Sequence, residues 1–246
     1  MPNGQFVIYG GHMSRSRCQR VWASVLVGAL AGCSSSTEPG LELRVVSVAT
    51  GLSTSVQLSA GDGGAVRLDD LNWTSVEVEL LRCRTALGWL GDTLIRSARA
   101  HGTSSPTLLA VPMVETAQAL DDVVLGTLRP PPARYCGVRY QLGPADADAF
   151  GLGDRPEMIR RSIYARGESA LEGRAGERFS LASSATFEVM ADLELDLSGE
   201  VVPREVRIER DESGWFRGVD VRDPDPARQA DQLVENFRTS VTIGSR

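Results

Sequence analysis

The stretch Ser75-Val-Glu-Val-Glu-Leu80 alternates polar and apolar residues along its whole length. A period of two is typical of a β-strand with one face buried and the other towards solvent. Leu41-Glu-Leu-Arg-Val45 repeats the alternation. Tyr135-Cys-Gly-Val-Arg-Tyr-Gln-Leu142 is rich in aromatic and β-branched residues and follows the turn-forming Pro130-Pro-Pro132. These segments predict a mostly β protein.

Further strand patterns lie between clusters of Gly, Pro and Asp, which favour turns. They cover residues 55–59, 65–68, 108–113, 161–165, 185–191, 201–210 and 240–243. Strands at this spacing predict an antiparallel β-sandwich. Residues 145–156, rich in Asp and Gly, are expected to form a loop, which is either an insertion or a hinge between two sub-sheets.

One helix is expected near the C-terminus. Asp225-Pro226 provides an N-cap residue followed by proline at the first helical position. The apolar residues that follow, Ala230, Leu233, Val234 and Phe237, share one helical face. A weaker helical pattern at residues 91–99 leaves a second short helix open.

The N-terminal region has the layout of a secretory signal. Met13-Ser-Arg-Ser-Arg-Cys-Gln-Arg20 carries three arginines and no acid, and residues 21–30 are apolar apart from one serine. An apolar run of roughly 10 residues is about half of what a membrane-spanning helix needs, so a permanent transmembrane anchor is not expected. Residues 1–12 fit no part of a signal, which points to Met13 as the true start.

The apolar run ends in Leu30-Ala31-Gly32-Cys33, which resembles the lipobox of bacterial lipoproteins. The resemblance implies a signal peptide at 1–32 and acylation of Cys33 with palmitate or a similar chain. The polar stretch after Cys33 lacks the apolar content to fold, so residues 33–40 are expected to form a lipidated, flexible tether. The strand patterns then place a β-sandwich domain at 41–246. In a Gram-negative cell, Ser34 after the lipidated cysteine resembles outer-membrane sorting more than inner-membrane retention, so the domain is expected in the periplasm or at the cell surface. The alternative is a buried N-terminal strand with Cys33 as a core thiol.

Removal of the signal also decides the cysteine count. Cys18 leaves with the signal and Cys33 is acylated, so the folded part keeps Cys83 and Cys136. In an exported, oxidising compartment two cysteines most simply form one structural disulfide. The alternative is a pair of free thiols that bind copper or zinc.

Charge limits the class of partner. Removing residues 1–32 takes away three arginines and no acid, which changes the net charge from −6 to −9. Because phosphate binding needs a basic patch, we expect no nucleic-acid partner.

Few residues point to catalysis. The sequence has no Gly-x-Ser-x-Gly, phosphate-loop, His-Glu-x-x-His or Cys-x-x-Cys motif, and His101 is the only histidine after Cys33. His101 is interpreted as a loop residue, with a metal ligand as the alternative. Trp215 and Phe216 are interpreted as core packing, or else as a binding platform for a ligand or partner.

Three pairs of acids invite comparison with carboxylate chemistry. They are Asp69-Asp70, Asp121-Asp122 and Asp146 with Asp148. Two carboxylates could act on a glycan, but adjacent acids at strand ends are usually turn formers. The run Asp220-Val-Arg-Asp-Pro-Asp225 lacks the spacing of a calcium loop, so capping of the helix is the better use of Asp225.

Three regions resemble secreted bacterial β-sandwich proteins similar to MbnP, the partner of a dihaem peroxidase. They are residues 125–140, Met158-Ile-Arg-Arg-Ser-Ile-Tyr-Ala-Arg-Gly167, and 206–219 with the closing Asn236-Phe-Arg-Thr-Ser240. The resemblance implies a sandwich fold. Family members that bind copper use histidines on sheet positions, and Phe179-Ser-Leu-Ala-Ser183, where one would be expected, contains none.

The leading hypothesis is therefore a lipid-anchored β-sandwich, not an enzyme, that binds a protein partner or ligand and needs no cofactor. The rival is a copper-binding accessory to a dihaem peroxidase, with His101, Cys83 and Cys136 as the available soft ligands. A glycan-active enzyme that uses a carboxylate pair is the third.

Overall fold

The computed structural model describes residues 41–52, 57–59, 65–83, 105–110, 112–153, 155–170, 176–199 and 203–246. All of them belong to one compact unit, Pro39–Arg246. The predicted signal at 1–32, Cys33, the tether at 33–40, the helical pattern at 91–99 and His101 lie outside the described residues. None of the described helices is long and apolar enough to cross a membrane.

The described chain is mostly β, as the alternating patterns predict. The strands are β1 (Leu43–Ser47), β2 (Gln57–Ser59), β3 (Ala65–Arg82), β4 (Leu108–Leu109), β5 (Met113–Thr116), β6 (Val123–Leu128), β7 (Arg134–Leu142), β8 (Ile163–Ala170), β9 (Glu177–Ser183), β10 (Phe187–Asp196), β11 (Glu205–Arg210) and β12 (Val241–Ser245). The helices are α2 (Pro226–Ser240) and two 3₁₀ turns, η1 (Pro156–Met158) and η2 (Glu212–Gly214).

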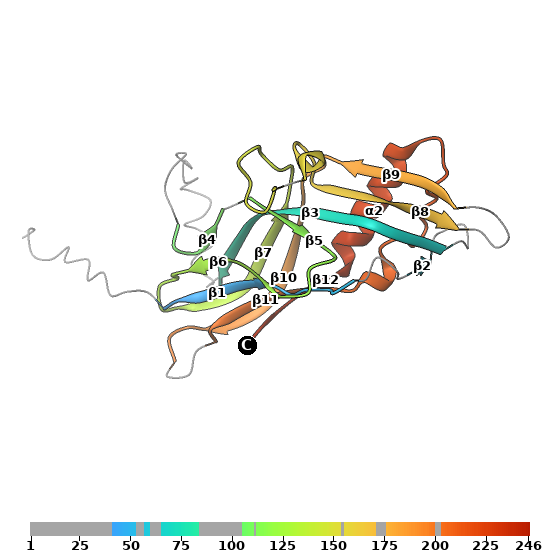
Figure 1. The fold of residues 1–246 in the computed structure, drawn as a ribbon. Coiled ribbons are helices and arrows are strands. Elements are labelled where there is room, and N and C mark those ends of the chain that lie inside the picture. The colour runs from blue at the N-terminus through green and yellow to red at the C-terminus, as the bar shows by residue number, and fades with distance from the viewer. Residues whose placement is uncertain are drawn as a thin grey trace, which may run out of the picture. The chain divides into compact units, whose positions relative to one another are not determined.

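Two sheets form the sandwich (Figure 1). The small sheet has the order β12-β11-β1-β6, and the large sheet has the order β10-β7-β3-β8-β9, with β2, β4 and β5 also paired to β3. The pairs between these strands are antiparallel, except that β1 and β11 run parallel, with Arg44 opposite Glu205. Local alternation predicts that a segment is a strand but does not choose its partner, so the parallel pair was not foreseen.

The core lies where the large sheet is covered by the small sheet and by α2. Phe237 of α2 packs on Trp73 of β3, with 5.1 Å between ring centroids, and both are buried. The helix also contacts β9 and β10. It buries Ala230, Leu233 and Val234, as the helical pattern predicts, and the Asp225 side chain caps it by accepting from the Arg228 amide at 3.2 Å.

The long central strand β3 joins two segments that the sequence predicts as separate strands, 65–68 and 75–80. A register shift between Leu68 and Asp70 marks a bulge in its pairing with β8, which lets the strand continue with a bend. Strands β6 and β9 were not predicted. Gly126 interrupts the pattern of β6, whereas β9 does alternate exposed and buried residues from Arg178 onwards and could have been found.

The loop between β7 and β8 is an insertion within the large sheet. Both of these strands pair with β3, so the interpretation of residues 145–156 as a hinge between two sub-sheets is wrong. The loop builds a second small core from Val114, Ala145, Ala149, Met158 and Tyr164.

Gly151 brings this loop close to β5. It has a φ of +72°, and a Cβ at this position would lie 2.4 Å from the Val114 carbonyl oxygen. The Val114 amide in turn donates to the Phe150 carbonyl at 2.7 Å. A side chain at residue 151 would therefore push the loop off the sheet.

Candidate functional site

A group of polar side chains is buried between the two sheets. Arg210 of β11 and Glu115 of β5 form an ion pair with 3.6 Å between Nη2 and Oε1, and their side chains are 0% and 2% exposed. Arg210 also donates to the Ser47 hydroxyl and to the Tyr140 hydroxyl, each at 2.7 Å. The guanidinium group thus joins the small sheet to the large one.

The carboxylate end of the pair is satisfied by β3. Trp73 Nε1 donates to Glu115 Oε1 at 2.9 Å, and the Ser75 hydroxyl donates to the same oxygen. The Ser75 and Tyr140 hydroxyl oxygens are 2.5 Å apart. Hydrogen bonds of this kind compensate the cost of burying charge.

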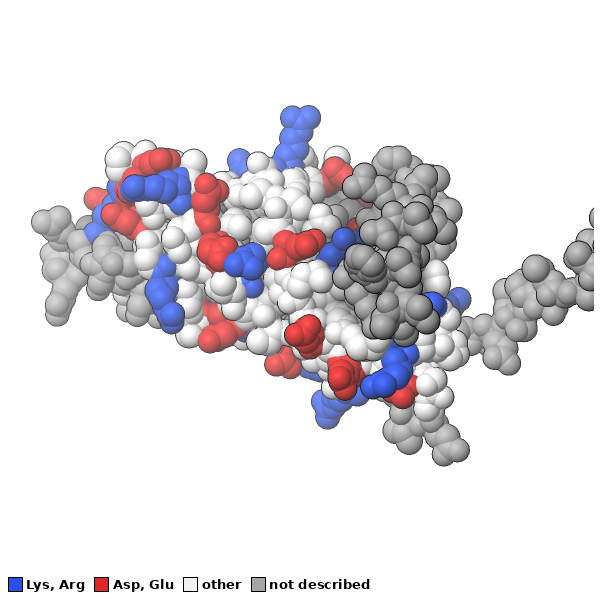
Figure 2. Space-filling view, turned by 180° about the vertical axis from the view of Figure 1, so that it is seen from behind, with Lys and Arg blue, Asp and Glu red and all other residues white. Residues whose placement is uncertain are grey.

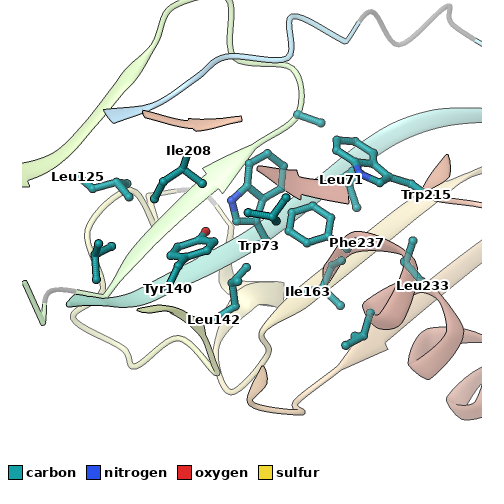
Figure 3. Packing of buried hydrophobic residues seen from close by; sticks show 14 of the residues in the cluster. Leu71, Trp73, Leu125, Tyr140, Leu142, Ile163, Ile208, Trp215, Leu233 and Phe237 are labelled. Carbon is teal, nitrogen blue, oxygen red and sulfur yellow. The ribbon is translucent and has the colours of Figure 1, made fainter. Parts of the chain in front are cut away.

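Aromatic rings enclose the ion pair. The Arg210 guanidinium carbon lies 4.6 Å from the centroid of the Trp73 ring, which is cation–π geometry. Trp215 and Phe237 pack beside Trp73 (Figure 3). Burial raises the pKa of Tyr140 to about 12, although the positive charge of Arg210 opposes this rise. The neutral phenol of Tyr140 is therefore favoured inside the folded protein well beyond the usual tyrosine range.

Trp215 and Phe216 do not form a surface platform. They are 0% and 1% exposed, so the alternative of a ligand or partner surface at these residues is wrong. Trp215 Nε1 donates to the Ser240 hydroxyl at 2.9 Å, and the Phe216 ring meets Phe179 at 6.0 Å between centroids. The η2 turn directs both side chains into the core, which the residue types alone could not show.

Cys83 and Cys136 are joined by a disulfide, with 4.7 Å between their Cα atoms. Cys83 follows the last residue of β3, and Cys136 lies in β7 next to Tyr135, which pairs with Arg82. The structure therefore supports the predicted pairing. While bonded, the two sulfurs cannot act as thiolate ligands.

The copper alternative thus depends on reduction of this bond and on His101, which is not among the described residues. Within the described part of the chain, no group of three or more His, Cys, Asp or Glu side chains is arranged to hold a metal ion. Copper binding stays a prediction.

The acid pairs differ in their surroundings. Asp122 accepts from the Ala49 amide at 3.0 Å, and this bond, with help from Arg207, lowers the pKa of Asp122. Asp146 and Asp148 are exposed in the loop after β7. In the run 220–225, Asp220 and Asp223 accept backbone amides of that same run, as turn formers do.

The remaining acid pair, Asp69-Asp70, borders two hollows at the surface of the large sheet. The first has a volume of about 560 Å³ and is lined by Asp70, Gly153, Arg155, Glu157, Tyr164 and Arg166. The second, of about 550 Å³, is lined by Asp69, Arg166, Gly167, Arg178, Phe179 and Ser180. We call the first hollow the outer cleft. Sequence reasoning named Asp69 and Asp70 but missed the arginines and Tyr164, because these come from other segments of the chain.

Charges in the outer cleft are held in place. Arg166 forms an ion pair with Asp70, whose negative charge raises the pKa of the guanidinium. Arg155 Nη1 donates to the Gly151 carbonyl at 3.0 Å. Asn72, opposite Tyr164 in the register of β3 and β8, is 1% exposed, and neither of its amide atoms has a hydrogen-bond partner among the described residues.

Elsewhere, acidic and basic side chains are interspersed. Figure 2 shows one face of the molecule, on which red and blue groups lie side by side among uncharged residues. Ion pairs between described residues include Arg139 with Glu77 and Arg238 with Glu235.

The described residues thus define a two-sheet β-sandwich completed by a C-terminal helix. No protein-family model and no curated protein matches the sequence. Among solved structures, MbnP from Methylosinus trichosporium is similar, with 13% sequence identity over 83% of this chain and 98% of that chain and a TM-score of 0.38. This is a distant structural resemblance and carries no information on a site or an activity.

Proposed function

We propose that this protein is an exported, lipid-anchored β-sandwich that binds a partner or ligand and does not act as an enzyme. The observation that carries the proposal is Leu30-Ala31-Gly32-Cys33, which follows a basic start and a short apolar run. Acylation of Cys33 with two or more chains would anchor the protein firmly, since each buried CH₂ contributes about 0.8 kcal/mol.

The disulfide supports export. Bonds such as that between Cys83 and Cys136 form and persist in oxidising compartments and are rare in the cytosol. This bond also joins two neighbouring strands of one sheet, as expected of a structural disulfide.

The surroundings of the ionisable groups support a binding role over a catalytic one. Glu115 and Arg210, the ion pair with the least exposed side chains, are enclosed between the sheets. A general acid or base must come within hydrogen-bond reach of its substrate, which this enclosure prevents. The charged groups of the outer cleft are open to solvent and suit recognition.

Metabolic labelling with palmitate tests the anchor. We expect label on the full chain and none on a Cys33→Ala variant. Cys18→Ala is the matched control, because Cys18 lies in the segment that cleavage removes, and this variant should be labelled like the original protein. Equal labelling of the original protein and Cys33→Ala would refute the anchor.

A further inference from the structure

The outer cleft has the size of a small-molecule site. Its volume of about 560 Å³ lies inside the range of about 300–1,000 Å³ that is usual for ligand pockets. Asp70, Tyr164 and Arg166 come from β3 and β8, which pair directly, and alternate with the buried Leu71 and Ala165. They therefore project from the sheet face that is turned away from the main core.

The other wall of the cleft is a loop with a defined shape. The backbone of Ala145 forms a bridge with Ile159, and Arg160 has a φ of +62°, a conformation that side chains rarely adopt without tertiary support. Met158 is fully buried beneath this loop. Arg155 and Glu157, which face the cleft, are thus carried by a segment that packing and backbone contacts hold against the sheet.

Among the described residues that line the cleft, the positive and negative charges are equal in number. Arg155 and Arg166 supply two guanidinium groups, and Asp70 and Glu157 supply two carboxylates. A simple anion would be attracted by the two arginines but repelled by the two acids. A simple cation would be attracted by the acids but repelled by the arginines. A molecule that carries both an ammonium and a carboxylate finds a partner for each charge.

Tyr164 adds an uncharged wall. It is 8% exposed, so most of its ring is already packed in the second core. Asn72 lies opposite it in the pairing of β3 and β8, and its amide atoms have no hydrogen-bond partner within the described part of the chain. The Arg166 side chain is 56% exposed. Part of its guanidinium group is therefore available to a ligand despite the ion pair with Asp70.

We propose that the outer cleft binds a zwitterionic ligand, a free amino acid or a short peptide, through Arg155 and Arg166 on its carboxylate and Glu157 and Asp70 on its ammonium. This assignment names the ligand class for the binding role proposed above and rests on that role. Because the cleft is open to solvent and screened, we expect a dissociation constant on the order of 0.1 mM.

Isothermal titration calorimetry on the full chain, purified from whichever cell fraction contains it, tests the assignment. The probes are alanyl-alanine, its N-acetyl form, which lacks the ammonium, and its C-terminal amide, which lacks the carboxylate. We expect alanyl-alanine to bind and each blocked form to bind at least about tenfold more weakly. The measurement does not depend on lipidation, so a failed anchor and a failed ligand assignment give separate results.

Variants place the binding in the cleft. Arg155→Gln and Glu157→Gln should each weaken binding of alanyl-alanine at least about fivefold, since each removes one charge partner. Arg129→Gln is the matched control, because Arg129 is an exposed arginine paired with Glu42 and does not line the cleft. Glu157→Gln keeps the shape of the side chain and so separates loss of charge from loss of fold. No heat of binding, equal binding of the blocked forms, or unchanged binding in both cleft variants would overturn the assignment.

Discussion

Arg210 and Glu115 meet inside the core, with 3.6 Å between Nη2 and Oε1, although one lies on the small sheet and the other on the large sheet. Neither residue stands out in the sequence as a site. Their pairing ties the relative position of the two sheets to a charge interaction that has little contact with water.

Breaking this ion pair should strongly destabilise the fold. Arg210→Met leaves Glu115 charged and buried, and we expect a loss of about 3–5 kcal/mol in the free energy of unfolding. Urea denaturation followed by tryptophan fluorescence measures the loss. Arg129→Met is the control, because this exposed pair with Glu42 should contribute no more than about 1 kcal/mol. The double variant Arg210→Met with Glu115→Leu should lose less than the sum of the single variants; strict additivity would mean that the two charges do not interact.

Alkaline pH should weaken the fold through Tyr140. Its folded-state pKa is raised from 10.0 to about 12, so the neutral phenol is favoured in the folded protein. The stabilising contribution is complete below the unfolded pKa of about 10 and is lost as pH rises towards 12. Across this pH window, the free energy of unfolding should fall more steeply with rising pH for the original protein than for Tyr140→Phe. The same pH dependence of this free energy in both proteins would show that Tyr140 does not titrate as a buried group.

The disulfide should stabilise the described domain by restricting the unfolded chain. Its sequence separation of 53 residues corresponds to about 4 kcal/mol in the loop-entropy model. We expect the Cys83→Ala, Cys136→Ala double variant to lose about that amount in urea denaturation. Mass spectrometry without reductant, on protein produced in the periplasm, should find a mass two hydrogen atoms lower than that of the reduced form. Two free thiols there would contradict the pairing and reopen thiolate ligation of a metal.

Phe237 should be a key contact between α2 and the large sheet. It is 0% exposed and packs on Trp73 and Trp215, so Phe237→Ala should cost about 3–5 kcal/mol. Phe150→Ala is the matched control, since Phe150 is 62% exposed and should change the stability by no more than about 0.5 kcal/mol. Thermal unfolding of both variants measures the two losses of stability. A similar loss of stability in Phe237→Ala and Phe150→Ala would mean that the Phe237 ring does not anchor α2.

The sequence by itself determined the elements whose information is local. Alternation in Ser75-Val-Glu-Val-Glu-Leu80 marks a strand because side chains on a strand point to opposite faces in turn. Asp225-Pro226 marks the start of α2 because capping and the fixed φ of proline act within one turn. Elimination also pointed to Cys83 and Cys136 as partners, since the other two cysteines lie in the predicted signal and at its predicted cleavage site.

Only the tertiary structure decided what depends on distant residues. Periodicity says that a face is buried but not what it faces, so the parallel pair β1–β11 and the burial of Trp215 had to come from the fold. The outer cleft is an extreme case, because its residues Asp70, Arg155 and Arg166 come from separate segments. The pairing of Glu115 with Arg210 also depends on distant segments. A charged residue in a strand normally faces water, and only the closure of two sheets around the pair makes its burial favourable.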